Sequence, residues 1–493
     1  MSSIQKKVLN GAIWMVALRF LVKSIGLVST MVLARILVPE DFGLVALAMA
    51  VYAFLELLNQ FGFDVALIQN QKATRDHYNS AWTMKVIFGL VAGLIMCFAA
   101  PWVSDFYHDE RLTHIIYILA LVFVVDAFEN IGIVDFRKEL NFNREFKFQL
   151  ITKVLAVTVT ISLALYFRNY WALVIGIFVG RCISLVFSYV LCSYRPGFTL
   201  VEARSLINFT KWLLATNFLA FINGRSKEII LGRIFEVKVV GLYTVAEEIA
   251  SLPSTEVIAP VNRAVFPGYA KVAENKSELQ ELYLNVISTI ALIAIPATIG
   301  LSILSPLVIP ILLGKNWLEA VPIIEIIAIA DCFIALNTNA AYFFTALGKP
   351  RITTFLLLIR VLVLVPLLIV FSKSFGLIGA AYSLLTVGMM MFPIYLAVIS
   401  RQVGVSLLRY IGAVYRPAVA AAIMYFLIKP YVSVIDASQL DFIDLLIDAL
   451  GYSLLGACVY ISSVIALWVL SGMPKSIEKE ILFRIYAKLN LIS

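Results

Sequence analysis

Long apolar runs, separated by short polar connections, dominate the chain. Each run approaches the roughly 20 residues that an α-helix needs to cross a bilayer. None shows the alternation that is typical of lipid-facing β-strands. The pattern therefore predicts an all-α integral membrane protein with about fourteen transmembrane helices. We place them near residues 11–37, 42–62, 80–103, 112–134, 149–167, 171–193, 207–235, 239–262, 281–312, 320–346, 351–372, 376–400, 410–428 and 445–470.

The beginning of the chain is repeated 198 positions later without a gap. Residues 10–48 and 208–246 agree at 12 of 39 positions. The agreements include the pairs Trp14/Trp212, Gly26/Gly224, Arg35/Arg233 and Gly43/Gly241. The copies begin at the first and seventh predicted helices, so an even number of crossings separates them and both have the same orientation. Such parallel repeats, related by an axis along the membrane normal, are a known transporter architecture. Identities kept by both copies are interpreted as scaffold.

The repeat predicts how the chain is organised. Two six-helix lobes in a parallel pseudo-twofold repeat would occupy residues 1–200 and 201–402, and two extra helices would lie within 403–473. The tail, 474–493, places apolar residues along one helix face beside several lysines and arginines. That pattern is typical of a helix that lies on the inner leaflet of a membrane.

The positions of basic residues predict the orientation. With a cytoplasmic N-terminus, the inside connections hold 21 Lys and Arg, whereas the outside connections hold 6. This bias follows the positive-inside rule. An even number of crossings also returns the C-terminus to the cytoplasm. The sequence therefore predicts a multi-pass membrane protein with both termini in the cytoplasm.

Composition narrows the class of function. The chain is 61% hydrophobic and 14% charged, whereas soluble domains are about 25% charged. The net charge of +8 is explained by basic loops that contact anionic lipid, so no nucleic-acid partner is predicted. The histidines and cysteines lack metal-ligand spacing, and no P-loop occurs. We expect no cofactor, and transport coupled to a proton or sodium gradient is an open alternative.

Two basic residues stand out within the first predicted helix. Arg19 and Lys23 lie four positions apart, and therefore on one helix face. In the second copy of the repeat their positions are taken by Asn217 and Phe221. The scaffold therefore does not require these charges. A charge within an apolar span costs about 3 kcal/mol on insertion scales and commonly faces a watery cavity or a partner.

Further charges lie in other predicted helices and permit two interpretations. The basic ones are Arg225, Lys227, Lys153, Arg181 and Arg360. They either bind substrate or form ion pairs, for example Arg225 with Glu228. The acids Asp126, Glu129 and Asp331 either neutralise such cations or bind a coupling proton or sodium ion. The sequence does not decide between these interpretations for either the basic or the acidic residues.

Two segments carry a resemblance to a known family. The run Leu33-Ala-Arg-Ile-Leu-Val-Pro-Glu-Asp-Phe-Gly-Leu-Val-Ala-Leu-Ala48 resembles the first-loop signature of bacterial Wzx-type polysaccharide flippases. These belong to the multidrug/oligosaccharidyl-lipid/polysaccharide exporter superfamily, and the chain looks most like its colanic acid and teichuronic acid exporters. Phe266-Pro-Gly-Tyr-Ala-Lys271, followed by a charged helix, is similar to a cytoplasmic segment of the same group.

The resemblance implies a function. A flippase of this kind would lie in the bacterial inner (cytoplasmic) membrane. It would move undecaprenyl-diphosphate-linked oligosaccharide units to the outer leaflet by alternating access, for the synthesis of exopolysaccharide, capsule or O-antigen. Its partners would be the lipid-linked oligosaccharide, membrane lipids, and a polysaccharide polymerase with its chain-length machinery. It would be a transporter and not an enzyme. Because Arg and Lys bind phosphate, we expect Arg19, Lys23, Arg225 and Lys227 to line a cavity between the lobes and to hold the diphosphate, with Lys153, Arg181 and Arg360 as second-rank candidates.

Two other functions are weighed against the flippase. A cation-coupled multidrug efflux transporter of the same fold would have cavities dominated by acids, whereas the central charges of the first and eleventh predicted helices are basic. A membrane-embedded polysaccharide polymerase or ligase would need a large outer loop with catalytic groups. The longest predicted outer connection is only the short stretch 429–444. The flippase is therefore favoured.

Overall fold

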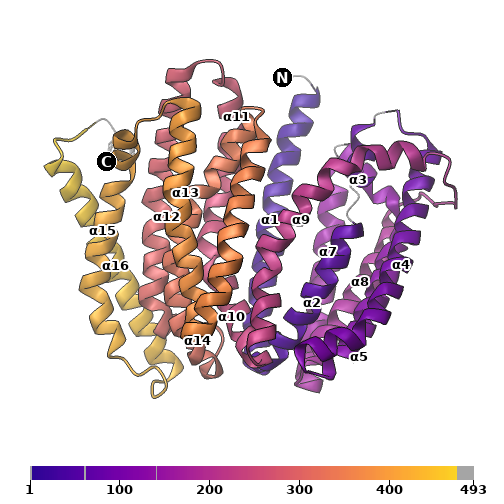
Figure 1. Ribbon diagram of the computed structural model, residues 1–493, viewed down its shortest axis with the longest axis horizontal. Coiled ribbons are helices and arrows are strands. Elements are labelled where there is room, and N and C mark those ends of the chain that lie inside the picture. Colours follow the sequence, from indigo (N-terminus) through magenta and orange to yellow (C-terminus); the bar gives the residue numbers. More distant parts are fainter. Residues whose placement is uncertain (1–2, 60–62, 71, 140, 475–493) are drawn as a thin grey trace, which may run out of the picture. The chain divides into compact units, whose positions relative to one another are not determined.

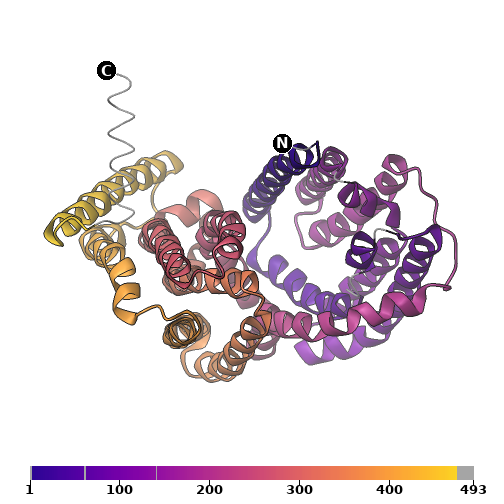
Figure 2. The same ribbon diagram turned by 90° about the horizontal axis from the view of Figure 1, so that it is seen from above.

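A computed structural model describes residues 3–59, 63–70, 72–139 and 141–474. Throughout these ranges every regular element is a helix (Figure 1). Contacts divide the chain into two compact units, Met1–Thr244 (unit 1) and Val245–Ser493 (unit 2). Figure 2 shows that many helices within each unit run side by side as a bundle. The lobe boundaries predicted from the repeat stay predictions, and the predicted tail beyond residue 474 lies outside the described residues.

Unit 1 is built from long helices with two short helical insertions. In chain order its elements are α1 (Ser3–Ile36), α2 (Pro39–Asn59), α3 (Phe63–Gln69), α4 (Arg75–Tyr107), α5 (Arg111–Ala127), η1 (Ile131–Ile133), α6 (Val134–Lys138), α7 (Phe142–Phe167), α8 (Trp171–Leu191) and α9 (Ala203–Ile234). Helix α10 (Val237–Ala250) crosses the boundary between the units. The main packing pairs of unit 1 are α4 with α5, α7 with α8, and α1 with α7.

Unit 2 contains the longest helices of the chain. Its elements are η2 (Pro253–Ile258), α11 (Ala259–Lys271), α12 (Lys276–Leu312), η3 (Lys315–Ala320), α13 (Val321–Ala346), α14 (Pro350–Val403), α15 (Leu407–Ser433) and α16 (Phe442–Leu470). Helix α12 packs against α13, α15 and α16.

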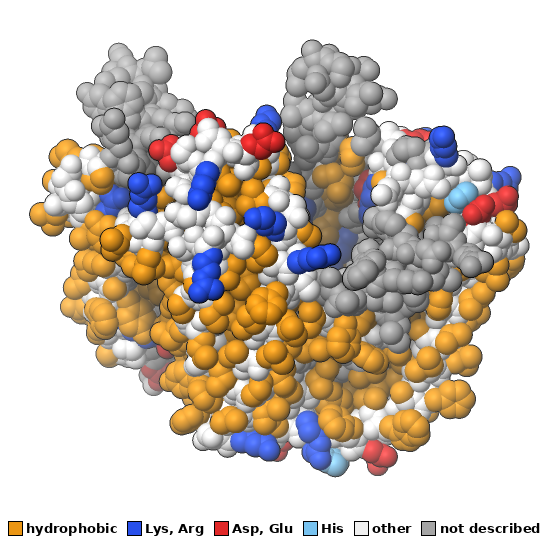
Figure 3. Space-filling view, turned by 45° about the horizontal axis from the view of Figure 1, so that its top comes forward, with side chains coloured by type: hydrophobic (Ala, Val, Ile, Leu, Met, Phe, Trp, Pro, Cys, Tyr) orange, Lys and Arg blue, Asp and Glu red, His pale blue; other side chains and the backbone are white. Residues whose placement is uncertain are grey.

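The prediction of an all-α membrane protein is confirmed. Among the described residues, eight helices are long and apolar enough to cross a membrane, or nine if the bent pair α5 and η1–α6 forms one span. Hydrophobic side chains cover the middle of each unit, and charged side chains gather toward its ends (Figure 3). The number fourteen stays a prediction, because these helices are counted by length and composition alone and α14 contains two of the predicted spans.

Two helix breaks depend on identifiable residues. Asn130 follows α5, and its side-chain oxygen accepts a hydrogen bond from the Gly132 amide. The chain bends here by 64°, although the sequence predicted one continuous helix near 112–134. In α14 the break is Gly376, with φ 64° and ψ −147°. Only glycine adopts such a conformation readily, and the break falls at the predicted gap between 372 and 376.

The glycine pair Gly43/Gly241 of the repeat lies at a close crossing within unit 1. A Cβ atom on Gly43 would lie 2.0 Å from the Val237 carbonyl oxygen, and one on Gly241 would lie 1.8 Å from the Pro39 carbonyl oxygen. The amide nitrogen of Gly43 itself would be 2.8 Å from a Cβ on Gly241. The first turns of α2 and α10 thus touch backbone to backbone. This packing is consistent with the interpretation of matched residues as scaffold.

Polar side chains join α11 and α13 in unit 2. Asn339 donates a hydrogen bond to the Asn262 side-chain oxygen (2.7 Å), and Asn262 donates to the Thr338 hydroxyl (3.2 Å). The hydroxyl of Tyr269 donates to Asn339 (2.9 Å). Asn262, Tyr269 and Asn339 are at most 1% exposed. Because a buried polar group is costly unless it is hydrogen-bonded, these bonds fix the register of the two helices.

Candidate functional site

Arg19 and Lys23 lie one helical turn apart on α1, and both are exposed within the described structure. Arg19 forms no ion pair with any described residue. A helix face with two accessible cations is suited to binding an anionic group.

The repeat-equivalent positions on α9 line a small cavity between α2 and α9. Asn217 and Phe221 border this cavity of about 220 Å³ together with Glu56 and Arg225. The Phe221 ring lies 5.5 Å from the ring of Phe54 on α2. The two positions that carry charges on α1 therefore carry an amide and an aromatic ring on α9. Arg225, one turn after Phe221, supplies a charge to this cavity.

Arg225 is paired within its own helix. Its guanidinium lies 3.1 Å from Glu228 Oε1, and the Glu228 side chain is 8% exposed. This is the ion pair that the sequence offered as the alternative to substrate binding. The neighbouring Lys227 is buried in the same turn. Arg225 keeps over a third of its side chain exposed, so it can reach a ligand in the α2–α9 cavity while Glu228 offsets part of its charge.

A four-residue ion network joins α4, α5 and α8. Asp126 lies 3.1 Å from Arg181 and 3.9 Å from the Lys85 ammonium. Lys85 is also 3.4 Å from Glu129, which accepts a hydrogen bond from the Ser184 hydroxyl (2.7 Å). Two cations and two carboxylates therefore balance one another. This favours the neutralising interpretation for Asp126 and Glu129.

Lys85 was not among the candidates that the sequence singled out. It lies within the apolar run Ala81–Phe88, so a charge near the start of a predicted span was an available signal. Its role became visible only when α4 was packed against α5. Glu56 interacts electrostatically with both Arg181 and Arg225. It therefore connects the ion network to the α2–α9 cavity.

Asp331 on α13 has a different environment. It is 2% exposed, and its Oδ1 accepts a hydrogen bond from Ser254 (2.8 Å). Its other oxygen has no hydrogen-bond partner among the described residues. Ser254 belongs to η2, a π-helical turn that directly precedes α11. Such turns often occur at functional sites. A buried carboxyl with one open oxygen can accept a proton or contribute to a cation site.

Two further basic candidates lie on α14 and α7. Arg360 on α14 interacts electrostatically with Asp331 and Glu247, and its Nε atom is buried without a hydrogen-bond partner in the described part of the chain. Lys153 on α7 is half-buried. In the residues that the structure describes, no group of three His, Cys, Asp or Glu side chains is arranged to hold a metal ion.

A long apolar groove lies between α12, α15 and α16. Its volume is about 620 Å³. Small residues form part of its wall, including Gly300 on α12 and Gly456 on α16. Ile293, Met424 and Ile461 are among the larger side chains around it. The groove has the chemistry of a hydrocarbon-binding surface.

The comparisons with known proteins decide the family. Residues 32–322, more than half of the chain, match the model of the polysaccharide biosynthesis protein family. The chain belongs to this family. The resemblance drawn from the two sequence motifs is thereby confirmed.

Curated relatives are similar over most of their length. The lipopolysaccharide biosynthesis protein WzxC of Escherichia coli K12 is 23% identical over 84% of this chain and 85% of its own. The succinoglycan biosynthesis transport protein ExoT of Rhizobium meliloti is 23% identical, with 82% of each chain covered. The teichuronic acid biosynthesis protein TuaB of Bacillus subtilis is 24% identical over 69% of this chain and 72% of its own.

Solved structures show the same fold. The lipid II flippase MurJ, in an inward closed conformation, has a TM-score of 0.74 at 14% identity and covers 92% of this chain and 98% of its own. An inward-facing multidrug transporter of the MATE family has a TM-score of 0.58 at 15% identity, with 76% and 94% covered. The chain is thus a multi-pass membrane protein with the helical fold of these transporters.

Proposed function

We propose that this protein flips undecaprenyl-diphosphate-linked oligosaccharide units across the bacterial inner membrane for the synthesis of a surface polysaccharide. The observation that carries the proposal is membership of the polysaccharide biosynthesis family together with the fold of a lipid-linked-substrate flippase. In this account the protein works by alternating access, both termini are cytoplasmic, and the exported unit passes to a polymerase. Of the relatives compared, three are named for the synthesis of a polysaccharide or lipopolysaccharide and none of them for drug efflux.

The diphosphate is assigned first to Arg19 and Lys23. A diphosphate cannot enter hydrocarbon without compensating charge. An arginine can bind phosphate through two parallel hydrogen bonds, and a lysine adds a mobile point charge one turn away. Both side chains are exposed on one face of α1. The second copy of the repeat keeps neither charge, which favours a role in binding over one in folding.

The other cations contribute less directly to binding of the diphosphate in this proposal. Arg225 and Lys227 contribute from α9, where Glu228 already offsets part of the charge of Arg225. Arg181 is engaged by Asp126, so it would shape the cavity more than bind phosphate. Lys153 and Arg360 stay second-rank candidates.

Asp331 is our candidate for the residue that binds the coupling proton or sodium ion. Its open carboxylate oxygen and its Ser254 partner provide two oxygen atoms at one point. Protonation or binding of a sodium ion would neutralise the buried charge. Asp126 and Glu129 fit this role less well because Lys85 and Arg181 already neutralise them.

The lipid part of the substrate needs a different surface. We assign the prenyl tail to the apolar groove of α12, α15 and α16. A long hydrocarbon chain gains about 0.8 kcal/mol for each methylene group that it buries, although in a bilayer most of that gain is already made. The groove therefore guides the tail rather than providing affinity.

The proposal is tested in a strain that lacks this gene. The wild-type chain should restore surface polysaccharide, and Arg19→Ala/Lys23→Ala should restore at least tenfold less at equal protein abundance. Lys373→Ala, which removes an exposed cation outside the site, is the matched control and should behave as wild type. Full restoration by the double variant would remove Arg19 and Lys23 from the site. Failure of the wild-type chain to restore any polysaccharide would overturn the function itself.

A further inference from the structure

A non-helical segment connects α8 to α9, and it is held firmly against unit 1. We call this segment, residues 192–202, the strap. Figures 1 and 2 show it running past the end of α4. Asn79 on α4 accepts a hydrogen bond from the Gly197 amide (2.8 Å), and Thr83 accepts one from the Thr199 amide (3.0 Å). Successive turns of α4 thereby satisfy backbone groups that would otherwise lack partners.

The first half of the strap is also fixed on its other side. Asn130 donates a hydrogen bond to the Tyr194 carbonyl (2.7 Å). A Cβ atom on Gly132 would lie 2.6 Å from Cys192 Sγ and 2.8 Å from Tyr194 Cβ, so η1 and the strap are in close contact. The Tyr194 hydroxyl donates a hydrogen bond to Asn79 (2.5 Å), and burial raises the pKa of this hydroxyl. The strap is therefore a preformed wall and not a loose linker.

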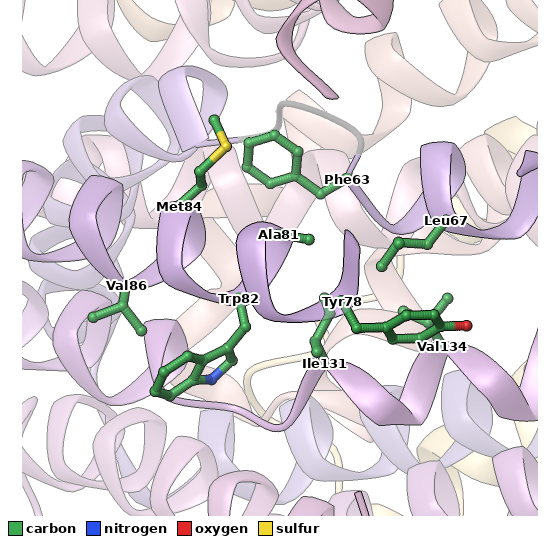
Figure 4. Packing of buried hydrophobic residues seen from close by; sticks show 9 residues of the cluster. All are labelled: Phe63, Leu67, Tyr78, Ala81, Trp82, Met84, Val86, Ile131 and Val134. Atoms are coloured by element: carbon green, nitrogen blue, oxygen red, sulfur yellow. The ribbon is translucent and has the colours of Figure 1, made fainter. Parts of the chain in front are cut away.

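A cavity of about 700 Å³ lies beneath this wall. The strap contributes Tyr194 and Arg195, α4 contributes Arg75 and Tyr78, and α6 contributes Lys138. Tyr78 is anchored in a hydrophobic cluster with Leu67, Ile131 and Val134 (Figure 4). The cavity is thus built from three elements whose positions are set by core packing and by the strap hydrogen bonds.

The three cations of the cavity, Arg75, Lys138 and Arg195, form no direct ion pair with a carboxylate among the described residues. Arg195 donates to the carbonyls of Cys192 (2.7 Å) and Tyr194 (2.9 Å). Lys138 donates to the Asn70 carbonyl (3.0 Å) and lies 5.3 Å from the Tyr78 ring centre. Arg75 lies 5.9 Å from the ring centre of Tyr194. Each cation keeps donors in reserve, because an arginine has five and a lysine three.

Two acids also border the cavity and narrow the class of ligand. Asp135 accepts a hydrogen bond from the Tyr78 hydroxyl, and Glu139 is exposed. A site for phosphate alone has no use for carboxylates. A sugar diphosphate uses both kinds of group, since its phosphates pair with Arg and Lys and its hydroxyls donate to carboxylates. Single-ligand sites usually measure about 300–1,000 Å³, so the volume fits.

We propose that the strap cavity is a second binding site, which receives the diphosphate and first sugar of the lipid-linked substrate. Naming the substrate rests on the proposed function. The count of basic residues predicts that this end of unit 1 faces the cytoplasm, where the substrate begins its passage. The cavity would then act as a loading site that precedes the site at Arg19 and Lys23.

The test uses the purified full chain in phosphatidylcholine nanodiscs, titrated with inorganic pyrophosphate in a calorimeter. The titration is made in the wild-type chain and in the Arg19→Ala/Lys23→Ala background, so that the two sites are measured separately. We expect binding to persist in that background and to weaken at least tenfold when Arg75→Ala and Arg195→Ala are added. Lys147→Ala removes an exposed cation of the same unit that does not line the cavity and should change nothing.

Three outcomes would overturn the proposal. In the first, pyrophosphate binds nowhere once Arg19 and Lys23 are replaced. In the second, it binds equally well without Arg75 and Arg195. In the third case, phosphatidylglycerol in the nanodisc would weaken pyrophosphate binding at the cavity by tenfold or more, which would assign the site to a lipid headgroup. If the variant with Arg75→Ala and Arg195→Ala does not elute from a gel-filtration column at the volume of the wild type, Arg75→Gln and Arg195→Gln are titrated singly. We then expect a several-fold loss of pyrophosphate affinity in each. The two proposals can also fail separately. If the cavity binds pyrophosphate but the chain restores no polysaccharide to the null strain, the site is supported and the proposed function is rejected.

Discussion

At the scale of single residues, the charges within the helices fall into two groups. Asp126, Arg181, Lys85 and Glu129 neutralise one another, whereas Arg19 and Lys23 are accessible on one helix face. The repeat identified the second group from sequence, because a charge present in only one copy is not needed by the scaffold. It could not identify the first group, since those pairs join α4, α5 and α8 across about 40–55 residues of sequence. Lys85 was missed for that reason.

Breaking the ion network should destabilise the protein without removing a substrate contact. Asp126→Asn leaves Arg181 without its partner and weakens the hold on Lys85. Fully buried pairs lose about 3–5 kcal/mol when one partner is removed. We expect about 1–2 kcal/mol here because Arg181 is partly exposed. Thermal unfolding of the purified variants measures this loss. Arg181→Gln combined with Asp126→Asn should lose less than the sum of the two single changes, and strict additivity would contradict the pairing.

Asp331 should control transport rather than stability. Asp331→Asn keeps an oxygen acceptor for Ser254 but cannot take up a proton or carry a charge. We expect polysaccharide export to fall at least tenfold at normal protein abundance, with little change in thermal unfolding. Glu325→Gln is a suitable comparison, because Glu325 also lies on α13 but is paired with Lys429. Normal export by Asp331→Asn would exclude Asp331 as the coupling group.

At the scale of elements, the sequence predicted most of the long helices and the break in α14. Periodicity and apolar length carry that information, and Gly376 marks the break with a positive φ. The bend after α5 was missed, because it depends on the side chain of Asn130 capping η1 within an apolar stretch. The strap was missed as well. Its conformation is set by Asn79 and Thr83, more than 100 residues earlier in the chain.

The crossing of α2 and α10 gives an element-scale prediction. Gly43→Ala places a methyl group within 2.0 Å of the Val237 carbonyl oxygen, so the helices must separate. Overpacking of this kind costs about 1–3 kcal/mol, and we expect a lower unfolding temperature and less protein in the membrane. Gly26→Ala is the matched control, since Gly26 is also shared by the repeat but has no atom within 4 Å of its Cβ position. It should be neutral or slightly stabilising. Equal effects of both changes would contradict the close crossing.

At the scale of the whole molecule, the proposed substrate has a charged head and a long hydrocarbon tail, and the chain offers a separate surface for each. The cations are on α1 and α9 of unit 1, whereas the apolar groove belongs to α12, α15 and α16 of unit 2. The family was recognisable from residues 33–48, but the groove was not, because its wall combines residues from three distant helices. The number of crossings and the orientation stay predictions from hydropathy and charge.

Filling the groove should block export without harming the fold. Gly300 lines it, and no atom lies within 4 Å of a Cβ atom at this position. Gly300→Trp would therefore occupy the groove, and we expect a several-fold loss of surface polysaccharide at normal protein abundance. Gly412→Trp on α15 is the control, because Gly412 is equally uncrowded and does not line the groove. If both variants export normally, the tail does not use this surface.

The central claim, that the chain itself flips a lipid-linked oligosaccharide, is tested most directly in proteoliposomes. The purified protein is reconstituted with lipid-linked oligosaccharide in both leaflets, and an impermeant oxidant reports how much glycan reaches the outside. With the wild-type chain, oxidation should proceed beyond the outer-leaflet share until nearly all the glycan is modified, and with Arg19→Ala/Lys23→Ala it should slow at least tenfold. If oxidation by vesicles with the wild-type chain stops at the outer-leaflet share, as in protein-free vesicles, the chain is not a flippase for this substrate.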